Sequence, residues 1–120
     1  MLDMYRNLAK GKVGLIITGY VGFSKTDYHN RGTVVLSEDS SLTGLKELTR
    51  TVHQHGSKVV AQINHAGSQL MSPPNGAVYG PSEVADPFSG ITPISFTENQ
   101  IRDLVTEFGD AAVLAKKSRV

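Results

Sequence analysis

Apolar residues follow two kinds of pattern along this chain of 120 residues. Two short segments, residues 13–18 and 59–63, are apolar at consecutive positions and rich in β-branched side chains. Such runs are typical of strands in a parallel sheet that is covered on both faces. Apolar residues at helical spacing predict three helices: residues 1–10, residues 41–55 and a segment that begins at Thr97.

Signals at the helix ends support these boundaries. Gly11 follows the first helix and Gly56 follows the second, where a glycine commonly ends a helix. Thr97 and Gln100 have the spacing of a capping box at the start of the third helix. The expected apolar face of this third helix consists of Ile101, Leu104, Val105, Phe108, Ala112 and Ala115.

The predicted order is helix, strand, loop, helix, strand, loop, helix, with long loops over residues 21–40 and 64–96. Alternating strands and helices indicate parallel βαβ units. Two strands do not complete a parallel sheet, because each leaves an unpaired edge. Long loops after the strands, and the absence of a GxGxxG segment, favour part of a (β/α) barrel over a doubly wound sheet.

Composition narrows the function classes. The net charge of +1 gives no reason to expect a nucleic acid or an anionic membrane as partner. The chain has no cysteine, which excludes thiolate metal sites and thiol nucleophiles, and His53 and His55 point to different sides of a helix, so we predict no metal site. No apolar run approaches the length of a membrane span or signal peptide, and we expect a cytoplasmic location.

Gln62 is the unusual residue of the second strand. A primary amide in a buried strand needs partners, because an unpaired buried polar group costs about 1–3 kcal/mol. Its two donors and two acceptor lone pairs suit the edge of a heteroaromatic ring, and ligands bind at the carboxyl ends of parallel strands. In the other interpretation, Gln62 bonds a neighbouring backbone group and His65 shapes a turn.

Three segments carry a resemblance to a known family: YRNLAKG at residues 5–11, VGLIITGY at 13–20 and AQINHAG at 61–67. They resemble the Old Yellow Enzyme family of NADH:flavin oxidoreductases, which are FMN-dependent TIM barrels, and the similarity continues through residues 80–82 and 97–101. The resemblance implies an α/β fold in which residues 1–120 form a single segment of a partial (β/α)8 barrel. This segment would contain about two β/α units and the end of the preceding helix.

The resemblance also implies a site. Gln62 matches the family glutamine whose amide bonds the pyrimidine edge of FMN, and Gly19 or Tyr20 matches the segment that lies against the flavin. His65 is expected to be structural, and Ser68 stands where the family usually has arginine. No catalytic residue is assigned, because the first strand is expected upstream of Met1 and the substrate-gripping strand after Arg119.

The implied activity is NAD(P)H-dependent reduction of an activated alkene or a similar small molecule through FMN, incomplete in this chain alone. The alternative is a catalytically inactive remnant or interaction module that retains the fold. Open strand edges and apolar strand faces also predict self-association.

Overall fold

A computed structural model describes residues 2–24, 27, 34–36, 40–71, 73 and 76–120. The elements are helix α1 (Leu2–Lys10), strand β1 (Leu15–Gly22), strand β2 (Val34–Val35), helix α2 (Ser40–His53), strand β3 (Lys58–Ile63), the 3-10 turn η1 (Gly67–Gln69), strands β4 (Tyr79–Gly80) and β5 (Ile94–Ser95), and helix α3 (Glu98–Lys117). No helix in these ranges is long and apolar enough to cross a membrane.

The main sheet has the order β2-β1-β3 and is parallel throughout, which confirms the predicted βαβ arrangement. The prediction for the first strand, residues 13–18, begins two residues before β1 begins and ends four residues before β1 ends. Residues 13 and 14 belong to the connection, because Val13 N–H donates to Leu8 O at the end of α1. Gly19 and Tyr20 therefore lie within β1 and do not end it.

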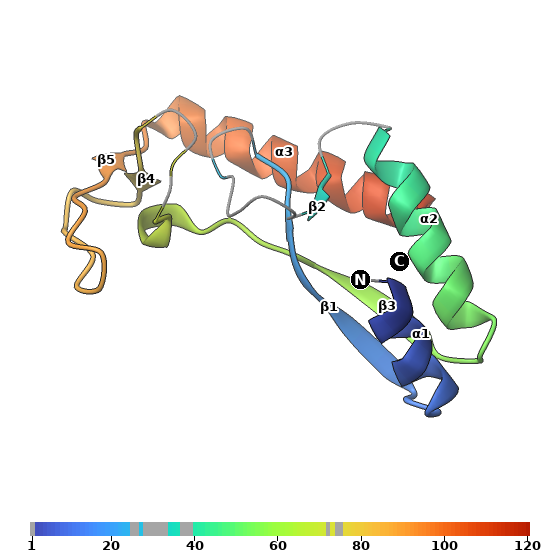
Figure 1. Ribbon diagram of the computed structural model, residues 1–120. Coiled ribbons are helices and arrows are strands. Elements are labelled where there is room, and N and C mark those ends of the chain that lie inside the picture. Colours follow the sequence, from blue (N-terminus) through green and yellow to red (C-terminus); the bar gives the residue numbers. More distant parts are fainter. Residues whose placement is uncertain (1, 25–26, 28–33, 37–39, 72, 74–75) are drawn as a thin grey trace.

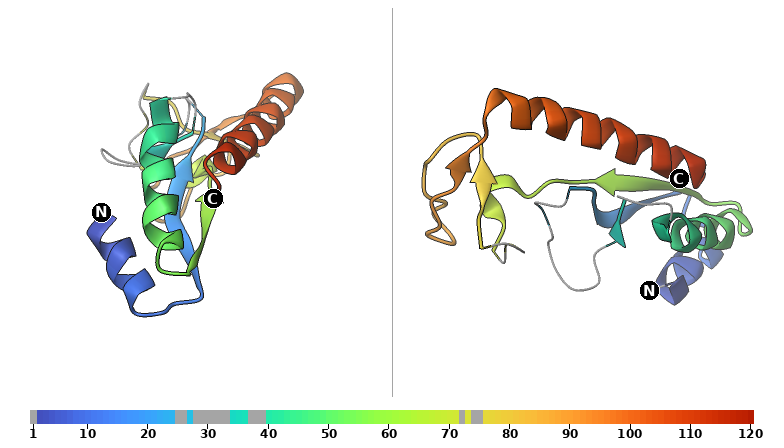
Figure 2. Two further views of the ribbon diagram at one scale, coloured as in Figure 1. Left: turned by 90° about the vertical axis from the view of Figure 1, so that its right-hand side faces the viewer. Right: turned by 90° about the horizontal axis from the view of Figure 1, so that it is seen from above.

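The two long loops contain structure that the sequence pattern did not predict. Within the segment 21–40, β2 pairs with the last two residues of β1. Within the segment 64–96, β4 and β5 form a separate parallel pair. Both pairs are only two residues per strand, too short to give a hydrophobic period. Figure 1 and Figure 2 show β4 and β5 at one end of the elongated chain, away from α1 and α2.

The helices cover only one face of the main sheet. The core on that face joins α1, β1, α2, β3 and α3, with Val52 and Ala9 fully buried and Leu45, Ile16 and Val59 nearly so. The other face is open: Ile17 is 62% exposed, and Leu15 and Val60 are also exposed. The consecutive apolar positions thus belong to one packed face and one open face, and the open face agrees with the exposed apolar strand faces expected for this chain alone.

The second helix agrees with its prediction to within two residues, and Gly56 has the positive φ of 83° that suits glycine. The capping box of α3 is confirmed, since Gln100 N–H donates to Thr97 Oγ1 and Gln100 Oε1 accepts from Thr97 N–H. The predicted apolar face of α3 is only partly correct. Of the predicted face, Ala115 is buried, whereas Ile101, Val105 and Ala112 are exposed; Ala111 is buried although it was not part of that face. Small side chains allow this helix to approach the core closely.

Candidate functional site

Tyr20 and Gln62 lie side by side at the carboxyl end of the main sheet. They are register partners on β1 and β3, and both side chains are exposed, Tyr20 to 60%. Directly opposite residues of paired strands point to the same face, so both side chains project from the open face. Two residues separated by 42 positions in the sequence thus form one surface, at the end of the strands where ligands of parallel folds bind.

This juxtaposition depends on an irregularity in β1. Ile17 pairs with Val60 and Tyr20 pairs with Gln62, so three steps along β1 match two steps along β3. The extra residue makes a bulge between Ile17 and Tyr20. Bulges of this kind occur next to active sites because they redirect a side chain.

Buried polar groups hold the bulge. The Thr18 hydroxyl accepts from the Gln62 backbone N–H at 3.0 Å and donates to Gly19 O at 2.8 Å. The Gly19 N–H donates to the hydroxyl of Tyr5 on α1 at 3.4 Å. Thr18 and Tyr5 are each 6% exposed. These bonds satisfy backbone groups that a regular ladder would have paired.

Gly19 is exposed, and a methyl group built on it would meet no atom within 4 Å. Its φ lies outside the left-handed region, so neither backbone strain nor a tight turn requires glycine at this position. The space beside it is open. Gln62 is exposed too, which corrects the expectation of a buried amide: its side chain is available on the open face.

Contacts of His65 and Asp27 hold the turn that follows β3. His65 Nδ1 accepts from Gly67 N–H at 3.0 Å, and the ring lies between Phe23 and Phe96, with both centroid distances 6.0 Å. Asp27, only 1% exposed, accepts from Ala66 N–H through Oδ2 at 2.7 Å. These contacts agree with a structural role for His65, and they tie the segment after β1 to the turn after β3.

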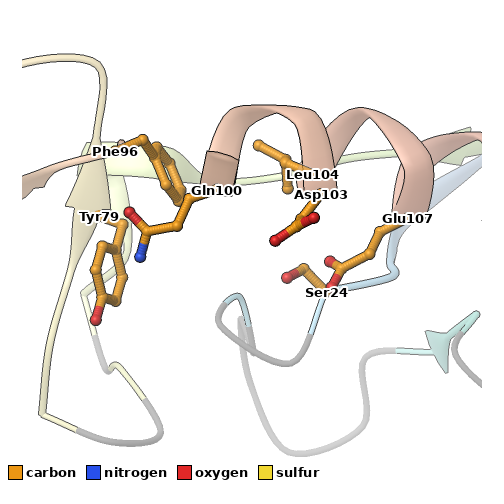
Figure 3. A pocket seen from close by; sticks show the side chains of 7 residues that line it. All are labelled: Ser24, Tyr79, Phe96, Gln100, Asp103, Leu104 and Glu107. Atoms are coloured by element: carbon orange, nitrogen blue, oxygen red, sulfur yellow. The ribbon is translucent and has the colours of Figure 1, made fainter. Parts of the chain in front are cut away.

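A separate hollow of about 180 Å³ lies between the N-terminal half of α3 and the loops (Figure 3). Tyr79 and Phe96 stack at one side, with ring centroids 5.5 Å apart. Asp103 and Glu107 of α3 direct two carboxylates into it. Because two carboxylates repel anions, this hollow does not suit a phosphate group.

Sequence reasoning missed Thr18, Tyr5 and Asp27 as supports of the site. Thr18 interrupts an otherwise apolar strand, which was an available signal for a buried hydroxyl with a specific partner. Tyr5 lies in the predicted first helix and in the YRNLAKG segment, and neither pattern indicates that its hydroxyl reaches a strand. Asp27 lies in a polar loop, and nothing in its neighbours indicates burial. No group of three or more metal-ligating side chains occurs in the described ranges.

The profile of the NADH:flavin oxidoreductase / NADH oxidase family matches residues 1–120. An NADH oxidase of Thermoanaerobacter brockii is 37% identical over 125 residues, a match that covers 97% of this chain and 18% of that protein. A metal reductase of Desulforamulus reducens is 33% identical over 117 residues, covering 97% of this chain and 17% of that protein. The structure of Old Yellow Enzyme from a Pichia species has a TM-score of 0.83 at 21% identity, covering 99% of this chain and 34% of that one.

The fold is thus an α/β segment that corresponds to part of a TIM barrel, with an exposed pair of side chains at the carboxyl ends of its strands. The chain belongs to the NADH:flavin oxidoreductase / NADH oxidase family. It spans less than a fifth of the length of the two relatives and about a third of the Old Yellow Enzyme chain.

The residues present fit one part of a flavin. Gln62 offers an amide and Tyr20 an aromatic ring on the open face, and Gly19, next to Tyr20 in the bulge, has no protein atom within 4 Å of the position of a Cβ. They match the ring system better than the phosphate end, since none of these three groups carries a positive charge.

Proposed function

We propose that this chain supplies one wall of the FMN site of an NADH- or NADPH-dependent oxidoreductase that reduces an activated alkene or a similar small molecule. The observation that carries the proposal is the pairing of Tyr20 with Gln62 on the open face, at the carboxyl ends of β1 and β3. Family membership supports the choice of FMN as the ligand of this pair.

Each residue would have a distinct part in binding. The Gln62 amide has both donors and acceptors, which matches the alternating polar atoms on the pyrimidine edge of the flavin ring. Gly19 would let the backbone of β1 lie against the ring, and Tyr20 would contact it beside Gln62. FMN, when bound, supplies hydride transfer between a nicotinamide and an acceptor, while the protein binds and orients it.

Three further points belong to this proposal. Residues 1–120 act as a single segment of the FMN-binding barrel. The protein works in the cytoplasm, which its lack of cysteine suits. The chain associates with itself through its strand edges and its open face, because β3 is an edge strand of the described sheet and large apolar side chains are exposed on that face.

Titration of FMN with the purified chain, followed by flavin fluorescence, tests the proposal. Gln62→Ala removes the amide, and Gln62→Glu removes its donors; each should weaken binding by roughly 5- to 150-fold, which corresponds to about 1–3 kcal/mol. Gly19→Ala should leave the fold intact, since the added methyl meets no protein atom within 4 Å. It should nevertheless weaken FMN binding, because the methyl would collide with the flavin ring.

Gln54→Ala is the matched control, because it removes an exposed glutamine that follows α2, at the opposite end of the strands. It should leave the dissociation constant unchanged. Equal affinities for the wild type, both Gln62 variants and Gly19→Ala would remove these residues from any flavin site.

The alternative function is an inactive remnant or interaction module. The open apolar face favours it, since such a surface also suits contact with another polypeptide. A chain that forms defined oligomers and takes up no FMN during the titration would support this alternative.

A further inference from the structure

The alternation of side chains along β1 changes phase at the bulge. Before it, Ile16 faces the helices and Ile17 faces the open side; after it, Tyr20 faces the open side and Val21 is buried. Strict alternation from Ile17 would instead place residue 20 among the helices and residue 21 on the open face. Given this sequence, Tyr20 reaches the open face only because the strand accommodates one extra residue.

Thr18 is the residue whose side chain makes that extra residue possible. Its hydroxyl accepts a hydrogen bond from the Gln62 N–H at 3.0 Å and donates one to Gly19 O at 2.8 Å. One buried group therefore bridges the two strands at the point where the ladder shifts. Only a hydroxyl both accepts and donates in so small a volume, so valine, which has the same shape, does not replace it.

We infer that Thr18 is a positioning residue: its buried hydroxyl holds the bulge that sets Tyr20 beside Gln62. The purpose of that pair, binding the flavin ring, rests on the function proposed above. Tyr5 assists from α1, because its hydroxyl accepts the Gly19 N–H that the bulge withdraws from the ladder.

The test compares Thr18→Val, which keeps the shape and loses the hydroxyl, with Thr18→Ser, which keeps the hydroxyl. Amide hydrogen exchange of Gln62 and the nuclear Overhauser contact between the Tyr20 and Gln62 side chains report the positioning directly. In Thr18→Val we expect Gln62 to exchange roughly fivefold or more faster, in line with the loss of one net hydrogen bond, and the contact to weaken. Thr18→Ser should retain both.

Thr106→Val serves as control, since it removes an exposed hydroxyl that bonds only within α3 among the described contacts. If Thr18→Val does not fold, the same substitution is made in a chain that lacks Gly19. Deleting Gly19 leaves an uninterrupted ladder with Ile17 on Val60 and Tyr20 on Gln62, so the hydroxyl is no longer needed. In that background Thr18→Val should fold and keep the contact.

The outcomes separate this inference from the proposed function. Unchanged Gln62 exchange and an unchanged Tyr20–Gln62 contact in Thr18→Val overturn the inference, whether or not FMN binds. Changed exchange in Thr18→Val with rescue in Thr18→Ser supports it. Wild-type protein that binds no FMN refutes the proposed function alone, because both positioning readouts are measured without flavin.

Discussion

Replacing Asp27 should destabilise the chain more than its place in a polar loop suggests. Its carboxylate is 1% exposed and accepts from Ala66 N–H at 2.7 Å, which joins the segment after β1 to the turn after β3. His65 Nδ1 lies 3.9 Å from the same oxygen. The carboxylate therefore holds together the two loops that flank the Tyr20–Gln62 pair.

The expected loss of stability depends on which hydrogen-bonding groups each Asp27 substitution leaves in place. Asp27→Ala removes the acceptor and leaves the Ala66 N–H without this partner, at a cost of about 1.5–3 kcal/mol for a bond to a charged group. Asp27→Asn keeps a carbonyl oxygen that can accept the same N–H and loses only the charge, so it should cost about 1 kcal/mol.

Urea unfolding measures the difference. With an m-value of about 1.5 kcal/mol/M for a small domain, Asp27→Ala should lower the midpoint by roughly 1–2 M. Asp103→Asn, an exposed aspartate of α3, is the control and should leave the midpoint unchanged. Hydrogen exchange at Ala66 should accelerate in Asp27→Ala and much less in Asp27→Asn. Unaltered midpoint and exchange in Asp27→Ala would refute the reasoning.

Two other predictions concern the whole chain. The isolated chain should reduce an enone with NAD(P)H no faster than free FMN does, because its described site has groups for the flavin ring only; saturable turnover well above free FMN would contradict this. The chain should also self-associate in sedimentation velocity at micromolar concentration. Val60→Lys on the open face should weaken this association more than Val113→Lys, a control at a similarly exposed valine of α3. A monomer at all concentrations would show that the open face does not drive association.

Sequence patterns predicted the order and type of the major elements because helical periodicity and runs of β-branched residues are local signals. They did not reveal which sheet face lies open. Leu15, Ile17 and Val60 have the same apolar character as the buried Ile16 and Val59, so composition cannot distinguish the two faces. The sequence pattern did not predict the two-residue strands β2, β4 and β5, because their pairing depends on segments distant in the sequence.

The resemblance points to Gly19, Tyr20 and Gln62 as candidate residues, but their arrangement depends on how the two strands pair in the fold. Gln62 stood out in the sequence as an amide in an apolar run, although its exposure was not foreseen. The position of Tyr20 could not be derived from alternation, which assigns it to the helix side. One extra residue in a strand changes the side on which every later side chain lies, and no short-range pattern announces it.

The open face of the main sheet divides into two halves with different chemistry. Toward the amino ends of the strands it carries Leu15, Ile17 and Val60, which are suited to packing against other apolar side chains. Toward the carboxyl ends it carries Tyr20 and Gln62, an aromatic ring and an amide suited to a polar heterocycle. A barrel has the same division, since its interior is filled by side-chain layers while ligands bind at the carboxyl ends of the strands. Because the bulge at Thr18 lies between the two halves, polypeptide contact along the first half leaves the second half available to a flavin.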